Sequence, residues 1–537
     1  MMVALTQQAP ADVLANVAAI GASAVVILVV VLRSRRPERG AAEFFTAGRG
    51  FTATQNGMAL TGGYLSAATF LGVAGAIAVY GYDGLLLAVA ALVAWLVALL
   101  LVGEWTRNTG RTTLGDVIAF RLRDRAVRKA VAAATLLITI LLLVVQIAAV
   151  GGMASLLLGI GSDNRFLQSV VIACVGAVVI GCVLAGGMRG ITWVQILKAN
   201  LLVVTGAVLA AWVLGRYGFD GSALLGAAVA NSPHAGEQLL APGLQFGSGA
   251  LAKLDFLSLA IAAVLGPASM PHVVMRFYTV ADGPTARRSV AWAIWLVGTF
   301  LLLVIVIGFG AAALVGAQTV LAAPGASNSA VPLLAHRLGG APLLGLVAAA
   351  VFTTVLGVAT GMLIAAATSF SRDLYGTRRN HAELGVARVA VVVVGVVATA
   401  GAVLVNGQNV AVLLALALAV AASANLPSLV YALFWREFNT TGALCGIYGG
   451  TALSLLLVVF SPAATGTPSS MLPGLDIAVF PLANPGLVAI PAAFLLAAVG
   501  TWVGQRDDMA KRRFAEMEVR AVTGAEPPDD DEPEPDR

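Results

Sequence analysis

The segment TGGYLSAATFLG, residues 61–72, places two adjacent glycines and several hydroxyl groups inside an apolar run that extends from 53 to 80. Two glycines weaken a helix by about 2 kcal/mol relative to alanine. At membrane depth, unwound backbone is tolerated where it packs in protein or lines a cavity; its free N–H groups can bind an anion and its free carbonyls a cation. The alternative is close helix packing through small residues, and the segment by itself leaves both interpretations open.

Other polar residues lie along further apolar runs, and almost none of them is a carboxylate. They are Ser66, Thr69, Gln146, Thr353, Thr354, Thr360 and Asn425, with Gln195, Lys198 and His272 nearer to the inner end of their runs. A Ser or Thr commonly bonds to its own helix, whereas the amides Gln146 and Asn425 need several partners. These amides suit contacts between helices as well as a substrate. We interpret Lys198 as a side chain that reaches the inner membrane surface, and His272 as a structural residue or a proton carrier.

The composition is that of a membrane protein. The 537 residues are 59% hydrophobic and 11% charged, with a mean hydropathy of +0.92, whereas soluble domains carry about 25% charged residues. Apolar segments recur along the whole length, which predicts an all-α polytopic membrane protein in a lipid bilayer. Cys174, Cys182 and Cys445 show no disulfide or metal-ligand spacing. We find no phosphate-binding loop and no nucleophile–base pair, so we expect neither an enzyme nor an ATP-driven pump, and no nucleic-acid partner.

The apolar periodicity predicts about thirteen membrane-spanning helices. They cover residues 14–32, 53–80, 85–104, 130–158, 166–186, 192–214, 254–274, 290–316, 341–369, 387–405, 410–433, 441–461 and 485–504. The first span has no basic residue before it, unlike a signal peptide.

Basic residues fix the expected orientation. Of the 32 Lys and Arg residues, Arg165, Arg216, Lys253 and Arg337 lie on one side of the predicted membrane, and the others lie on the side of RSRRPERG, which follows the first span. Cytoplasmic loops carry the excess of positive charge. We therefore expect a protein of the cell membrane with its N-terminus outside and its C-terminus in the cytoplasm. The acidic tail EPPDDDEPEPDR is expected to be disordered.

Several stretches resemble a known family. They are FFTAGRGFTATQNGMALTGGYLSAATFLG followed by GYDGL, then GGMRGITWVQILKA, ASMPHVVMRFYTVAD, FSRDLYG and NGQNVAVLLALALAVAASANLP. In this order, from about Phe44 to Trp435, they resemble the sodium/solute symporter family, in particular its acetate (monocarboxylate) permease branch.

The resemblance implies a leucine-transporter-like core of two inverted repeats with five helices each. The predicted topology allows this, because two consecutive five-helix units that begin on opposite sides must be inverted. The expected organisation has four parts: a peripheral helix and cytoplasmic loop at 1–50; a transporter core at 51–435, with repeats at about 51–214 and 254–435; two peripheral helices at 436–505; and a cytoplasmic tail, partly disordered, at 506–537.

The resemblance also implies a sodium site between the second and the ninth span. The residues that match it are Gly62, Leu65, Thr354, Gly357 and Val358. The proline and sugar symporters of the family have hydroxyl residues at the last two positions. The proline carriers have an aspartate where Tyr64 stands, and the sugar carriers have one where Gln195 stands. The cation site is therefore incomplete. We expect sodium from the resemblance, and coupling to protons, with His272 as a possible proton site, stays open.

The implied function is cation-coupled uptake of acetate or a similar short-chain monocarboxylate. We expect Gly62 and Gly63 to unwind the second span, and we expect the substrate at this interruption, bound by backbone N–H groups and nearby side chains. These candidates are Gly63, Tyr64, Ser66, Ala67, Thr69, Gln146 and Asn425. No cofactor is expected apart from the coupling ion. The alternatives are a symporter for pyruvate, propionate or an amino acid, and a transport-inactive sensor or a channel on the same fold.

Overall fold

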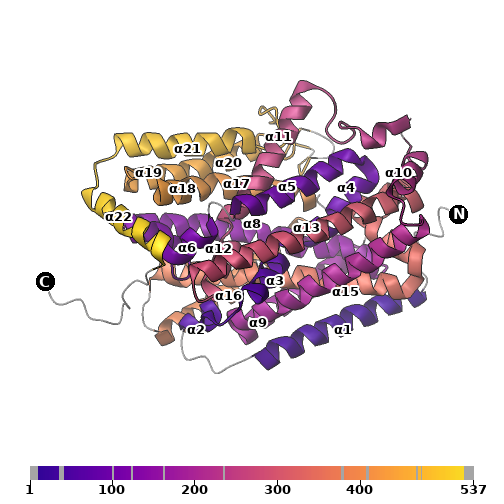
Figure 1. The fold of residues 1–537 in the computed structure, drawn as a ribbon, viewed down its shortest axis with the longest axis horizontal. Helices are drawn as coiled ribbons and strands as arrows, with labels where there is room; N and C mark the ends of the chain where they lie inside the picture. The colour runs from indigo at the N-terminus through magenta and orange to yellow at the C-terminus, as the bar shows by residue number, and fades with distance from the viewer. Residues whose placement is uncertain are drawn as a thin grey trace.

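The structure is a computed structural model that describes residues 10–34, 41–98, 102–122, 125–160, 164–233, 236–376, 380–406, 410–466, 470–472 and 474–524. The described chain is a bundle of helices, and the axes of most of the long helices are roughly aligned (Figure 1). The acidic tail and most of RSRRPERG lie outside the described residues, and so do the predictions made for them.

The helices follow one another as below. The first part of the chain contains α1 (Pro10–Ser34), α2 (Ala41–Thr46), η2 (Ala47–Arg49), α3 (Ala53–Tyr64), η3 (Ala68–Gly72), α4 (Val73–Tyr80), α5 (Tyr82–Ala98), α6 (Glu104–Thr109), α7 (Leu114–Leu122), α8 (Arg125–Leu157), α9 (Arg165–Arg216) and α10 (Gly221–Ala230). Then come α11 (Ala250–Leu265), η6 (Gly266–Ser269), α12 (Pro271–Val274), η7 (Met275–Thr279), α13 (Gly283–Leu314), α14 (Ala317–Ala322), α15 (Ala330–Ser369) and η9 (Phe370–Tyr375). The last are α16 (Asn380–Leu404), α17 (Val410–Ala424), α18 (Leu426–Phe434), α19 (Thr440–Leu444), α20 (Gly450–Val459), α21 (Gly486–Val503) and α22 (Asp508–Thr523).

The membrane-spanning character of the chain is confirmed, but the number thirteen is not. Among the described residues, 10 helices are long and apolar enough to cross a membrane, or 11 if the bent pair formed by α3 and the segment 68–80 counts as one. One of them, α9, has 52 residues, which is far more than the roughly 20 that cross a bilayer. Gly187 interrupts it with φ 51° and ψ −160°. The predicted spans 166–186 and 192–214 lie on either side of this glycine.

Burial separates central helices from peripheral ones. In the span Ala326–Tyr375, which contains α15, 83% of the apolar window is buried, against 11% in the span of α1. Leu14, Val25 and Leu28 of α1 are exposed, as expected for side chains that face lipid. The centre of the bundle holds α3, which packs against α9 and α13 and also contacts α15. These neighbours determine the environment of the interrupted helix.

The tail of the chain forms a helix that the sequence analysis did not predict. Asp507 caps α22 by accepting a hydrogen bond from the N–H of Ala510, and Gly524 ends it with a left-handed backbone. The helix packs on α6, α7 and α18 at the end of the bundle opposite to α10 (Figure 1). Asn108 donates to the carbonyl of Ala521 at 2.7 Å. The segment 506–537 is therefore in part an ordered element.

The guanidinium of Arg121 joins this helix to the core. It is fully buried and donates to the carbonyls at the C-terminal end of α18, including Ala432 at 3.2 Å and Trp435 at 2.6 Å, and to Ala510 of α22 at 3.3 Å. It also stacks on the ring of Phe514 with its central carbon 4.7 Å from the ring centroid. One side chain thus satisfies the free carbonyls of one helix and binds the next.

We expect Arg121→Lys to detach α22, because a lysine has no planar fork that reaches several carbonyls at once. Limited proteolysis of the purified protein should show faster cleavage near residue 506. Arg512→Lys is the matched control, since Arg512 lies on the same helix at an exposed position. Equal cleavage of both variants would contradict the role given to Arg121.

Candidate functional site

The second predicted span is interrupted, as the sequence analysis expected. The α3 helix ends at Tyr64, Leu65 adopts an extended conformation with ψ 107°, and the next helical residues begin after Ser66. The two halves meet at an angle of 67°. Figure 1 shows α3 and α4 as separate helices. Backbone groups at the interruption are therefore released from the regular helical ladder.

The two glycines themselves lie within α3, so the expectation that they unwind is wrong. Gly62 serves close packing instead, and so does Gly57 five residues earlier. A Cβ atom at Gly62 would lie 2.2 Å from the backbone oxygen of Gln195 on α9, and one at Gly57 would lie 2.8 Å from the carbonyl oxygen of Ser289 on α13. Small residues on α3 let the backbones of both neighbours approach closely. The break follows directly after this tightly packed surface.

Two of the predicted substrate residues cap the second half of the broken helix. The hydroxyls of Ser66 and Thr69 lie 3.2 Å apart, and the N–H of Thr69 donates to the Ser66 hydroxyl at 3.2 Å. This pair satisfies backbone donors that an interrupted helix leaves free. Ala67, between them, is buried.

Tyr64 points away from this cap. Its hydroxyl donates to the carbonyl of Ala91 on α5 at 3.0 Å, and its ring packs edge-on against Trp95 with the centroids 5.2 Å apart. Gly63 faces the side-chain amide of Gln195, with 3.4 Å between a Cβ built there and Oε1. The residues next to the break thus connect it to α5 and α9.

The predicted cation ligands lie at the interface of α3, α9 and α15, and α9 supplies hydrogen-bond donors to two of them. Lys198 Nζ donates to the carbonyl of Gly62 at 2.5 Å, and Gln195 Nε2 donates to the carbonyl of Gly357 at 3.1 Å. Lys198 is fully buried. The interpretation of Lys198 as a side chain at the inner surface is therefore wrong.

Among the described residues, no side chain of α9 donates a hydrogen bond to the other predicted cation ligands. The hydroxyl of Thr354 donates to Ala350 of its own helix at 2.6 Å, which is the common alternative for a threonine in a helix. Val358 and Leu65 are buried and contribute no polar side chain. In Leu65 the N–H group remains bonded to the carbonyl of Thr61 at 2.9 Å.

Two of the predicted substrate residues have buried side-chain amide atoms with no hydrogen-bond partner among the described residues. These are Oε1 of Gln146 on α8 and both side-chain atoms of Asn425, which stands between α17 and α18. The α17 helix packs against α8 and against η3, the start of the second half of the broken helix. A buried amide without a partner is costly unless a ligand or water satisfies it.

Arg276 was not among the predicted site residues, and it lies in η7 against the first half of α3. It is almost fully buried; Nη1 donates to the hydroxyl of Thr192 at 2.5 Å, and Nη2 has no partner among the described residues. Its carbonyl accepts from Asn56 Nδ2 at 3.2 Å. Nδ1 of the nearby His272 is likewise without a partner within the described chain. The signal available was a basic residue directly after an apolar run.

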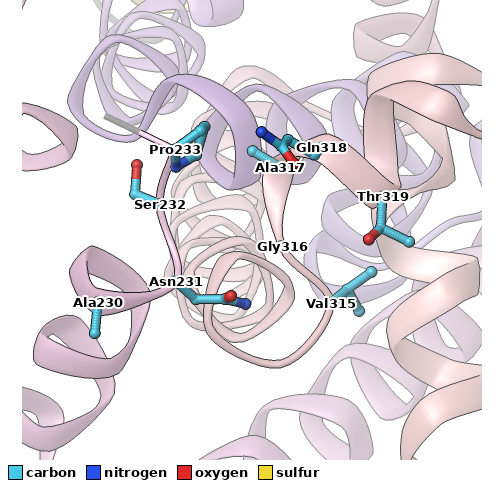
Figure 2. A pocket seen from close by; sticks show the side chains of 9 residues that line it. All are labelled: Ala230, Asn231, Ser232, Pro233, Val315, Gly316, Ala317, Gln318 and Thr319. Carbon is cyan, nitrogen blue, oxygen red and sulfur yellow. The ribbon is translucent and has the colours of Figure 1, made fainter. Parts of the chain in front are cut away.

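A cavity of about 310 Å³ lies elsewhere, between the end of α10 and the turn that leads into α14 (Figure 2). Its lining residues are Ala230, Asn231, Ser232, Pro233, Val315, Gly316, Ala317, Gln318 and Thr319. None of the predicted substrate or cation residues belongs to this lining. Asn231 donates to the carbonyls of Ala312 and Ala313, both at 3.1 Å, so it caps the end of α13.

The fold is similar to that of two solved transporters. One is a Na+-coupled sialic acid symporter, with a TM-score of 0.69 and 15% identity, covering 92% of this chain and 98% of that one. The other is Mhp1, a nucleobase-cation-symport-1 family transporter, with a TM-score of 0.53 and 15% identity, covering 92% and 100%. At this identity the likeness shows the fold alone. It confirms the predicted all-helical, leucine-transporter-like core.

Two relatives match at higher identity. A monocarboxylic acid transporter of Corynebacterium glutamicum is 48% identical over 515 residues, which cover 93% of both chains. The uncharacterized symporter YwcA of Bacillus subtilis is 38% identical over 512 residues, or 93% of this chain and 96% of that one. Both are named as transporters, which confirms the prediction that the chain is not an enzyme. The profile of the Sodium:solute symporter family matches residues 44–450, and this chain belongs to that family.

Proposed function

We propose that the protein is a secondary transporter that takes up acetate or a similar short-chain monocarboxylate together with a cation, by alternating access. The observation that carries this proposal is the 48% identity, over 93% of both chains, to a monocarboxylic acid transporter. The interrupted α3 supports it, because a discontinuous helix is the usual place for substrate and coupling ion in transporters. The proposed orientation has the N-terminus outside and the C-terminus in the cytoplasm.

We propose that the carboxylate binds beside the break, at the residues named from the sequence. In the pair formed by Ser66 and Thr69, one hydroxyl proton is used between them and the other stays available to an anion. Both N–H bonds of the Asn425 amide lack a partner among the described residues. Neutral donors of this kind hold a carboxylate without an ion pair, and the small Ala67 and Gly63 leave room for a short chain.

A related carrier for pyruvate, propionate or an amino acid is the closest alternative. It would use the same helices with different side chains around the substrate. Competition experiments therefore have to determine the carbon-chain length that the site prefers. A channel or a sensor is the alternative from another class. Neither needs a gradient of a coupling ion, so accumulation against a concentration gradient distinguishes them from a symporter.

Purified protein in liposomes is expected to accumulate labelled acetate when an inward sodium or proton gradient is imposed. Propionate and pyruvate should compete, and proline should not. Protein-free liposomes are the control, because undissociated acetic acid crosses lipid by itself. Equilibration without accumulation under both gradients would indicate a channel, and strong competition by proline would indicate an amino-acid carrier.

A further inference from the structure

The side chain of Lys198 crosses from α9 into the interface between α3 and α15. Its Nζ lies 2.5 Å from the carbonyl oxygen of Gly62 on α3. Its stem passes over α15 at Gly357, where an added Cβ would lie 2.9 Å from Lys198 Cδ. Because Gly357 has no side chain, the lysine can extend across α15 to the end of α3.

This position coincides with the predicted cation site. The carbonyls of Gly62 and Gly357 are the backbone oxygens expected to bind the ion, and they already accept hydrogen bonds from Lys198 and Gln195. Thr354 bonds to its own helix. A sodium ion needs several oxygens, and it would meet an ammonium group at the same carbonyl. The residues present therefore do not fit a sodium ion at this place.

We propose that the ammonium group of Lys198 takes the place of the coupling cation between α3 and α15, and that a proton carried by this amine drives uptake. The inference rests on the proposed function, since it names the coupling ion of that transporter. In the outward-facing state the amine takes a proton from water outside and forms an N–H bond. In the inward-facing state this bond breaks, the lone pair stays on Nζ, and the proton leaves to water inside. One proton then accompanies one carboxylate, and no net charge crosses.

The surroundings of Lys198 leave its charge unbalanced. No ion pair to it exists among the described residues. On α3 the titratable residue is Tyr64, which bonds to α5, and α15 carries no titratable residue between Leu338 and Ser369. The same holds for α13 from Ser289 to Leu314, and for the middle of α1, α8 and α16.

The charged groups that do act on this region are basic. The positive charges of Arg276 and Lys198 both act on the imidazole of His272. Arg276 also donates a hydrogen bond to Thr192, which lies six residues before Lys198 on α9. An ionisable residue at membrane depth commonly marks a proton or substrate pathway. A monocarboxylate that arrives at the break would supply the negative charge that Lys198 lacks. This couples substrate binding to protonation.

The wild-type protein in liposomes tests the ion. In sodium-free medium, an inward gradient of one pH unit should drive about tenfold accumulation of labelled pyruvate, because one unit corresponds to 1.36 kcal/mol for one proton. Pyruvate is used beside acetate since the stronger acid leaks less through lipid. A sodium gradient at equal pH on both sides should drive none. Accumulation that needs sodium and ignores the pH gradient would overturn the inference while the proposed function stands.

Variants test the residue. Lys198→Met and Lys198→Arg should lose accumulation under the pH gradient, so that the inside and outside concentrations become equal. Lys198→Arg should exchange labelled against unlabelled pyruvate faster than Lys198→Met, because arginine keeps the charge without releasing the proton. A monodisperse peak in size-exclusion chromatography shows that each variant is folded. Lys253→Met, at an exposed position, is the matched control and should accumulate as the wild type does.

Three results would overturn the assignment. One is full accumulation under the pH gradient in Lys198→Met or Lys198→Arg. The second is loss of that accumulation in His272→Gln together with its retention in Lys198→Met, which would move the proton site to His272. The third is absence of wild-type uptake of pyruvate and acetate under every gradient, which would reject the proposed function itself.

Discussion

Gly62→Ala is expected to reduce uptake to background. The added Cβ would lie 2.2 Å from the backbone oxygen of Gln195 and 2.8 Å from its carbonyl carbon. Backbone atoms cannot rotate away as a side chain does, so α3 must separate from α9. Overpacking of this kind costs about 1–3 kcal/mol. The separation also removes the carbonyl of Gly62 from Lys198 Nζ, and it distorts the break that lies two residues later.

The measurement is initial uptake of labelled substrate, normalised to the amount of monodisperse protein in size-exclusion chromatography. Gly206→Ala is the matched control, because it adds the same methyl group to α9 at 3.5 Å from Leu303 Cδ1, an ordinary contact. It should transport as the wild type does. Normal transport by Gly62→Ala would show that the close approach of α3 and α9 is dispensable.

Arg128→Met is expected to lower the thermal stability of the protein by several degrees. Arg128 Nη1 bridges Asp116 at 2.9 Å and Asp373 at 2.8 Å, and the side chain of Asp373 is fully buried. Although burial raises the pKa of Asp116, the nearby charges of Arg128 and Arg372 outweigh this effect and hold that pKa well below its usual range. Removing the guanidinium leaves two neighbouring carboxylates without their shared partner. Breaking a buried pair costs about 3–5 kcal/mol, and the partial exposure of Arg128 reduces this to about 2–3 kcal/mol.

The double variant Arg128→Met, Asp373→Asn separates this cause from a loss of packing. It removes the uncompensated buried charge and should recover most of the stability. Arg287→Met is the surface control, since Arg287 lies 3.5 Å from Glu104 and is 66% exposed; it should change the midpoint little. The measurement is the unfolding midpoint in detergent by intrinsic fluorescence. A double variant no more stable than Arg128→Met would show that the charge is not the reason.

The sequence located the break in the second span to within a few residues, but the prediction that Gly62 and Gly63 unwind was wrong. A Gly-Gly pair is compatible with unwinding and with close helix packing, and the choice depends on the partner helix. That partner is Gln195, far away in the sequence, so local reasoning could not decide. Ser66 and Thr69 carried the better local signal, because their spacing is that of a helix cap.

Lys198 was misplaced for a related reason. It falls near the predicted inner end of a span, where a lysine commonly reaches the membrane surface, and span boundaries from sequence are uncertain by several residues. Its partner Gly62 is 136 residues away. The apolar pattern did not reveal α22, because this helix is rich in charged residues. Its signals, Asp507 before the helix and Gly524 after it, were those of a soluble helix.

The docking of α22 has a consequence for how the inner end of the protein moves. Since α22 rests on α6, α7 and α18 together, these four helices form one block on the cytoplasmic side of the proposed orientation. We expect an inward gate to open along another seam, such as the one where Asn56 of α3 donates to the carbonyl of Arg276. Spin labels placed on α22 and α7 should keep a constant separation throughout the cycle, while labels on α3 and η7 should not.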